Sequence, residues 1–186
     1  SRGLGDVYKR QGFIVTNSRE ISDKLRFLIK TVGSGLAPFD SWLILRGIKT
    51  LPIRMEKAQE NAQAIVEFLL QEKKVTKVYY PGIEGTKAYE ICKKQASGFG
   101  SMLTFEVESK ELALHILKST KLIPFAESLG GVETLLTYPT TQTHADVPEE
   151  VRIRNGITDR VLRLSVGIED KADLIADLKQ AIDSYR

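Results

Sequence analysis

The sequence predicts an α/β fold in which helices pack on one sheet and a long helix precedes that sheet. From residue 75 onward, short β-type runs alternate with helical runs, which is typical of a sheet covered by helices. From residue 41 to residue 72, apolar residues step by three or four, and a helix of this length would extend ~50 Å. Because that exceeds the diameter of a small domain, we expect the helix to link two bodies.

The beginning of the chain divides at a glycine-rich break. Residues 1–11 show no periodicity and resemble a non-native leader, so they do not enter the fold prediction. Residues 13–16 have the composition of a short strand, and residues 22–29 have the pattern of a helix. Residues 33–38 contain two glycines and a proline, which predicts a bend.

The long helix should begin after Asp40, whose side chain suits an N-cap. Pro52 should kink or divide it, because proline supplies no amide hydrogen and crowds the preceding turn. The apolar positions are Leu45, Ile48, Leu51, Met55, Ala58, Ala62, Ile65 and Leu69. We assign residues 12–56 to the remnant of a larger domain and the start of the linking helix, and residues 57–186 to a C-terminal domain.

The C-terminal domain should contain four strands and four helices. Gly156 should end the third of these helices, and Asp170 should cap the fourth. The apolar stripe of the fourth helix is formed by Leu174, Ile175, Leu178, Ala181 and Ile182. Strands are expected at 75–80, 101–107, 132–137 and 161–166, and the first three helices at 87–95, 111–119 and 148–155.

Composition excludes several classes of function. With 42% hydrophobic and 27% charged residues, the chain is typical of a soluble globular protein, and no apolar run approaches the roughly 20 residues of a membrane span. The single cysteine, Cys92, permits no internal disulfide and favours the reducing cytoplasm. His115 and His144 are far apart, so no metal site is expected. The net charge of +3 falls to +1 without the three basic and one acidic residues of 1–11, so nucleic-acid binding is not expected.

Arg163 is the most unusual residue of the predicted strands. Leu162, Leu164 and Val166 share the face that must meet the core, and Arg163 lies on the other face. A guanidinium on an apolar strand needs a partner, because burying an unpaired charge is costly. It could form a structural salt bridge or reach water. Alternatively, its planar fork could bind a substrate carboxylate.

Two loops near the predicted third strand are polar or rich in glycine. In residues 125–131, the adjacent Gly130 and Gly131 could let the backbone approach an anion, or could simply form a turn. Residues 140–146 carry several hydroxyls and could be a solvated connection. His144 alone does not predict a general base, because no Ser or Cys lies at a suitable spacing.

Four segments carry a family resemblance, at residues 38–55, 126–133, 143–144 and 163–170. They read PFDSWLILRGIKTLPIRM, AESLGGVE, TH and RLSVGIED. Together and in this order they resemble signatures of the trans-sulfuration (Cys/Met metabolism) family of pyridoxal-phosphate (PLP)-dependent enzymes. The resemblance covers roughly residues 12–186. It implies the C-terminal small domain of a fold-type I PLP enzyme, preceded by the linking helix and a remnant of the large PLP domain.

The resemblance also implies roles for individual residues. Arg163 matches the arginine that binds the α-carboxylate of the amino-acid substrate. Ser128 matches a residue beside that carboxylate, and Thr143 matches a threonine that helps to hold the arginine. Glu127 stands where members that act at the γ-carbon commonly have glutamate, and residues 137–157 are most similar to bacterial cystathionine γ-synthases and O-acylhomoserine thiolyases.

Two departures from the family limit these implications. Lys30 stands where many relatives have an asparagine that faces the active site, which leaves the substrate preference open. The lysine that binds pyridoxal 5'-phosphate precedes residue 12 in the family's order, so neither Lys30 nor Lys49 is expected to form a Schiff base. We therefore expect no catalytic residue in this chain and no activity from the chain alone.

Three kinds of function remain open at this stage. The first is part of a cystathionine γ-synthase that joins O-acylhomoserine to cysteine in a homotetramer, with cystathionine γ-lyase or β-lyase as alternatives within the family. The second is a non-catalytic domain that binds amino acids or regulates a partner. The third is a structural interaction module.

Overall fold

The structure, a computed structural model, describes residues 14–185. Its centre is an antiparallel four-stranded sheet in the order β1-β2-β4-β3. The strands are β1 (Val75–Tyr79), β2 (Met102–Val107), β3 (Leu135–Thr137) and β4 (Val161–Ser165). Because β4 pairs with both β2 and β3, its residues lie in the interior of the sheet.

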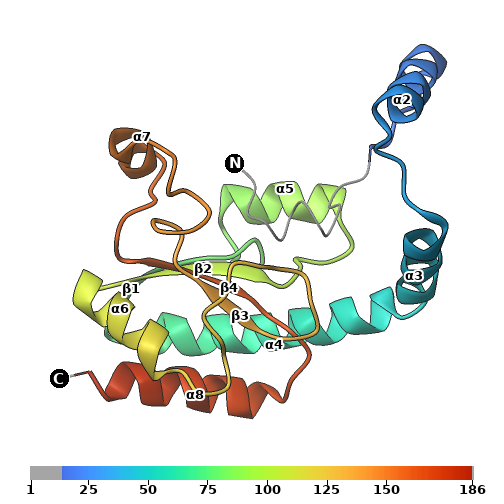
Figure 1. The fold of residues 1–186 in the computed structure, drawn as a ribbon. Coiled ribbons are helices and arrows are strands. Elements are labelled where there is room, and N and C mark those ends of the chain that lie inside the picture. The colour runs from blue at the N-terminus through green and yellow to red at the C-terminus, as the bar shows by residue number, and fades with distance from the viewer. Residues whose placement is uncertain (1–13, 186) are drawn as a thin grey trace.

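Helices cover one face of this sheet. In Figure 1, α4 (Leu51–Gln71), α6 (Lys110–Ser119) and α8 (Lys171–Asp183) lie below the sheet, whereas α5 (Lys87–Gln95) and α7 (Glu149–Arg154) lie above it. The side chains of Ser109 and Asp170 accept backbone amide hydrogens at the starts of α6 and α8. Each of these side chains satisfies a helix-end donor that would otherwise lack a partner.

The core fills the space between the sheet and the covering helices. Leu162, Leu164 and Val166 are at most 1% exposed, as their alternation in the sequence predicts. Burying a large apolar side chain contributes about 1.5–3 kcal/mol, so this layer holds the domain together. The helices supply the following fully buried partners: Ala62, Ile65, Leu69, Leu112, Ile116, Leu174 and Leu178.

The predicted long helix is divided near Pro52. The first part, α3 (Pro38–Ile48), is followed by α4, and Pro52 lies in the first turn of α4, where its missing amide hydrogen costs no helical bond. The prediction of Asp40 as N-cap is wrong. Ala37 is the N-cap of α3, because Pro38 can begin a helix and the helix therefore starts earlier.

Two predicted strands differ from the structure. Residues 14–16 form no strand, because no strand of the described chain pairs with them, while residues 1–13 lie outside the described residues. The third strand covers 135–137 rather than 132–137. Residues 132–134 instead face residues 167–169, to which they are hydrogen-bonded.

The N-terminal helices lie away from the sheet. Figure 1 shows α3 at the end of α4 and α2 (Arg19–Val32) beyond it, and neither helix contains a buried residue. Gly33 ends α2 with a φ of 74°, a conformation that glycine adopts without steric cost. The first buried residue of α4 is Ala58, and the domain division between residues 56 and 57 stays a prediction. Within residues 14–185, every helix is too short or too polar to span a bilayer.

Candidate functional site

The candidate site lies on the sheet face opposite the core helices. In the register of the sheet, Arg163 of β4 is flanked by Thr104 of β2 and Thr137 of β3. Ser165 follows on the same face and is 1% exposed. The alternation of β4 therefore places a cation and a hydroxyl side by side on the face that α4, α6 and α8 leave open.

The guanidinium of Arg163 is held on one side only. Its Nη2 donates to Oγ1 of Thr137 at 3.3 Å, and that hydroxyl donates to the carbonyl of Ala126 at 2.9 Å. Its Nε is buried without a hydrogen-bond partner. A buried donor without a partner costs roughly 1–3 kcal/mol of stability. A ligand that accepts a hydrogen bond from this Nε would remove that cost.

No carboxylate of the described residues forms an ion pair with Arg163. The salt bridges within 4.0 Å in residues 14–185 do not include it, so the structural ion pair is not formed there. Burial lowers the pKa of Arg163, and the negative charge of Glu127 acts in the opposite direction. An arginine side chain stays protonated in proteins, so the site carries a positive charge.

The glycine-doublet loop, residues 125–131, runs beside Arg163. At its start, the amide of Ala126 donates to the carbonyl of Leu136 at 2.9 Å. At its end, the amide of Gly130 donates to Oγ of Ser165 at 2.9 Å. Gly130 has a φ of 76°, which favours glycine at this position. These bonds fix both ends of the loop to the two strands that carry Thr137 and Arg163.

The structure brings together two of the predicted site residues, Arg163 and Glu127. Glu127 and Ser128 belong to the glycine-doublet loop, and Glu127 is the charge that acts on Arg163. Thr143 makes a different contact: its hydroxyl lies 2.8 Å from Nδ1 of His144. The hydroxyl that Arg163 reaches belongs to Thr137, which the sequence analysis did not select.

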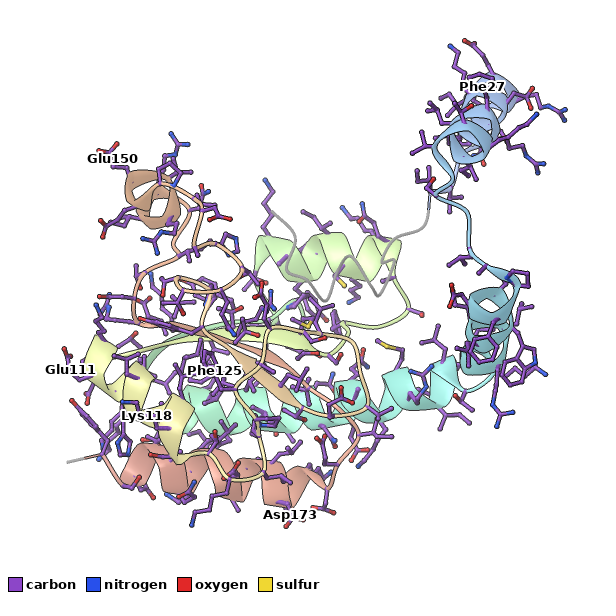
Figure 2. The ribbon with its side chains drawn as sticks, viewed as in Figure 1. Phe27, Glu111, Lys118, Phe125, Glu150 and Asp173 are labelled. Carbon is purple, nitrogen blue, oxygen red and sulfur yellow. The ribbon has the colours of Figure 1, made fainter. Side chains whose placement is uncertain are left out.

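Lys30 lies far from this group. It is an exposed residue of α2, and Figure 2 shows Phe27 of the same helix well apart from Phe125 of the glycine-doublet loop, which lies in the middle of the packed domain. The described part of the chain therefore does not bring Lys30 to Arg163. Its predicted role toward the substrate stays a prediction.

The site has the chemistry of an anion-binding site. It offers a half-buried guanidinium and neutral hydroxyls, and the one histidine nearby in sequence, His144, contacts Thr143. The described residues include no group of three side chains that could hold a metal ion. A planar carboxylate suits the arginine fork, because both groups can form two parallel hydrogen bonds.

Comparison with known proteins places the chain in a family. The sequence model of the Cys/Met metabolism PLP-dependent enzymes matches residues 3–183. The chain belongs to this family. The match extends into residues 1–11, whose expected foreign origin stays a prediction. The resemblance seen in the four sequence segments is thereby confirmed.

Members of the Cys/Met metabolism family with different activities are similar to the chain. It is 46% identical over 172 residues to cystathionine beta-lyase of Lactococcus lactis subsp. cremoris (strain MG1363), covering 92% of the chain and 45% of the relative. It is 49% identical over 173 residues to cystathionine gamma-lyase of Dictyostelium discoideum, with the same coverage. It is 47% identical over 175 residues to cystathionine gamma-synthase of Haemophilus influenzae, covering 94% and 43%.

A solved member of the family has the same fold. Cystathionine gamma-lyase from Lactobacillus plantarum, complexed with L-serine, superposes with a TM-score of 0.87 at 40% identity, over 91% of the chain and 45% of that protein. The predicted fold class, α/β as in part of a fold-type I PLP enzyme, is confirmed. The chain spans less than half the length of the relatives it matches.

The family is PLP-dependent, so a complete active site must bind both an amino-acid substrate and PLP. A guanidinium such as that of Arg163 suits a carboxylate, the group that every amino acid carries. Within the described chain, the hydrogen bonds around Arg163 involve no lysine, and the expected absence of the Schiff-base lysine stays a prediction. Lys49, at the C-cap of α3, lies with that helix at the far end of α4 (Figure 1).

Proposed function

We propose that this chain forms the part of a PLP-dependent trans-sulfuration enzyme that binds and orients the α-carboxylate of the amino-acid substrate. The observation that carries the proposal is the state of Arg163: a half-buried guanidinium with an unpartnered Nε and no carboxylate partner in the described chain. A substrate carboxylate would neutralise this charge and complete its hydrogen bonds. A purely structural arginine would be expected to have an internal partner already.

The neighbouring residues support this role in different ways. Thr137 holds one end of the guanidinium, which leaves the rest of the fork for the ligand. Ser128 lies in the adjacent glycine-doublet loop, and we propose that its hydroxyl donates a hydrogen bond to the same carboxylate. Glu127 brings a negative charge near Arg163, which suits the positively charged amino group of an amino acid.

In the complete enzyme, fixing the carboxylate limits rotation of the substrate. PLP, when bound, supplies a conjugated ring that accepts electrons. The part of the reaction that falls to Arg163 is to hold the substrate in one orientation, which lowers the entropic cost of the reaction. We propose that the chain alone is inactive, because the described site residues include no lysine to form a Schiff base.

The reaction we propose is cystathionine γ-synthesis, in which cysteine replaces the acyl group of O-acylhomoserine. Glu127 favours chemistry at the γ-carbon, so cystathionine γ-lyase is the nearer alternative and β-lyase the more distant one. A homotetramer in the cytoplasm accompanies this proposal as the expected assembly and location. A protein of the relatives' length that carries residues 12–186 would test the reaction in assays with O-acetyl- and O-succinyl-homoserine against cysteine, sulfide and cystathionine.

Ligand binding by the chain itself tests the carboxylate site directly. We expect the nuclear magnetic resonance signal of the Arg163 Nε–H to shift during titration with L-serine. Titration with L-serinamide, which has no carboxylate, should leave the signal in place. Arg163→Lys keeps the charge but loses the fork, so the affinity for L-serine should fall by about tenfold or more. Equal shifts with L-serine and L-serinamide would contradict the proposal.

A non-catalytic amino-acid-binding domain would use the same arginine. The two proposals differ in the affinity that they predict for the isolated chain. A binding domain should reach its full affinity for an amino acid without any further part of a protein. Binding of L-serine by the isolated chain as tight as by a full-length relative would favour the binding domain. Much weaker binding by the isolated chain would favour the enzyme.

A further inference from the structure

The glycine-doublet loop is also held from the side away from Arg163, at the segment that directly follows it. The carbonyl of Val132 accepts from the amide of Ile168 at 2.8 Å. Oγ1 of Thr134 accepts from the amide of Gly167 at 2.9 Å and donates to Oε2 of Glu169 at 2.7 Å. Thr134 is fully buried, so these bonds are shielded from water.

The two segments approach each other closely. A Cβ added at Gly167 would lie 2.1 Å from the carbonyl oxygen of Val132, which no side chain could tolerate. Residues 167–169 begin two residues after Ser165, which binds the amide of Gly130. The turn after β4 and the end of the glycine-doublet loop therefore form one hydrogen-bonded unit, and this unit adjoins Arg163 through β4.

Asn61 of α4 connects this unit to the linking helix. Its Nδ2 donates to the carbonyls of Gly167 at 3.0 Å and Glu169 at 2.7 Å. Asn61 is 0% exposed and lies among the apolar residues of α4 that pack on the sheet. Its Oδ1 has no hydrogen-bond partner, so burying this atom costs stability that the two bonds of Nδ2 must offset.

We propose that Asn61 and Thr134 are positioning residues of the carboxylate site. Asn61 sets the turn at 167–169, the turn sets residues 132–134 through Thr134, and these fix the glycine doublet beside Arg163. The position of the glycine-doublet loop therefore depends on the position of α4. Asn61 exerts this effect without contacting the ligand. This inference rests on the proposed function of Arg163.

Two pairs of matched variants separate positioning from general stability. Thr134→Val keeps the volume but removes the hydroxyl, whereas Thr134→Ser keeps the hydroxyl. Asn61→Asp keeps the shape but replaces the two donors with an oxygen that faces two carbonyls. Glu60→Gln changes the neighbouring residue, whose surface salt bridge with Lys171 lies outside the network. If Asn61→Asp does not fold, the Thr134 pair decides.

Amide hydrogen exchange in the 186-residue chain is the first measurement. Thr134→Val and Asn61→Asp should accelerate exchange at Gly130 and Ile168 by about tenfold or more, because these amides donate within or beside the network. Exchange at Leu164 and Leu178, in the core, should not change. Thr134→Ser and Glu60→Gln should match the unaltered chain.

Titration with L-serine, followed at the Arg163 Nε–H signal, is the second measurement. The two disruptive variants should bind about tenfold more weakly, and the two conservative variants should bind normally. Unchanged exchange at Gly130 and Ile168, or acceleration shared equally by Leu178, would overturn the positioning role. Failure of the unaltered chain to bind L-serine would instead contradict the proposed function, while the exchange rates still report whether Asn61 and Thr134 hold the loop.

Discussion

At the scale of single residues, two arginines three positions apart differ in whether their charge has a partner. Nη2 of Arg160 forms a salt bridge of 2.6 Å with Glu106, which is buried. Within residues 14–185, the guanidinium of Arg163 hydrogen-bonds to the hydroxyl of Thr137 alone. A buried charge that lacks a partner lowers stability and is retained where function needs it. The two arginines should therefore respond differently to removal of their charge.

Arg163→Met should leave the free energy of unfolding unchanged or raise it by up to about 1 kcal/mol, because the change removes a desolvated charge. Arg160→Met should lower it by about 1–3 kcal/mol, because the carboxylate of Glu106 loses its partner. Urea denaturation at neutral pH measures both. A loss at Arg163 as large as that at Arg160 would contradict the view that Arg163 awaits an external partner.

Tyr80 should make the stability of the domain depend on pH in the alkaline range. Burial raises the pKa of Tyr80 to about 12, with a smaller contribution from the charge of Cys92, and its hydroxyl donates to the carbonyl of Gly100 at 2.8 Å. Since the ordinary tyrosine pKa is about 10, the folded state keeps the proton longer than the unfolded state. The stabilisation is therefore complete below pH ~10 and is lost as the pH rises toward 12.

The loss over this pH range should amount to about 2 kcal/mol. Denaturant unfolding at a series of pH values, compared with Tyr80→Phe, isolates the contribution of this one hydroxyl from those of other tyrosines and lysines. The difference in unfolding free energy between the two proteins should shrink as the pH rises. A difference that is independent of pH would mean that Tyr80 ionises equally in both states.

At the scale of elements, the helices and strands that depend on local sequence patterns were predicted correctly. Helices 87–95 and 111–119 and strand 161–166 lie within one residue of the observed bounds, because caps and apolar periodicity act locally. The start of β3 was predicted three residues too early, because Thr134 turns away to bind Glu169, a partner far along the chain. Thr137 was missed for the same reason: only the order β4-β3 places it beside Arg163.

Asp177 shows how one side chain can join elements that no local pattern connects. It lies on α8, is 6% exposed, and accepts the amides of Lys121, Leu122 and Ile123 at 2.8–2.9 Å. These residues follow α6 and lead into the glycine-doublet loop. The carboxylate therefore fixes the path of the chain from α6 toward the site.

Asp177→Asn should lower the free energy of unfolding by about 2–3 kcal/mol, because an amide offers one acceptor oxygen and no charge to three backbone donors. Asp173→Asn, at an exposed position of the same helix, should cost about 0.3–1 kcal/mol through the helix dipole alone. Thermal and urea unfolding of the two variants provide the comparison. Equal losses of unfolding free energy would show that the hydrogen bonds from Asp177 to the three amides contribute little to stability.

At the scale of the whole molecule, residues 14–185 consist of a packed domain and two helices that contain no buried residue. The core lies between the sheet and α4, α6 and α8, whereas α2 and α3 bury no side chain and stand apart in Figure 1. Their exposed apolar residues include Phe27, Val32, Phe39, Trp42 and Leu45, which are 53–73% exposed. Such surfaces are typical of regions that another part of a protein covers.

A chain that consists of residues 50–186 should therefore keep the stability of the longer chain. We expect its thermal midpoint to lie within about 2 °C of that of residues 1–186, because no core residue is removed. The longer chain should scatter more light at equal concentration, because its apolar helices associate. The double change Trp42→Glu and Leu45→Glu should reduce this scattering, whereas Gln71→Glu, at an exposed polar position of α4, should not. Unfolding of residues 50–186 at a much lower temperature would mean that α2 and α3 contribute to the folded core, and the view of two unpartnered helices would then be wrong.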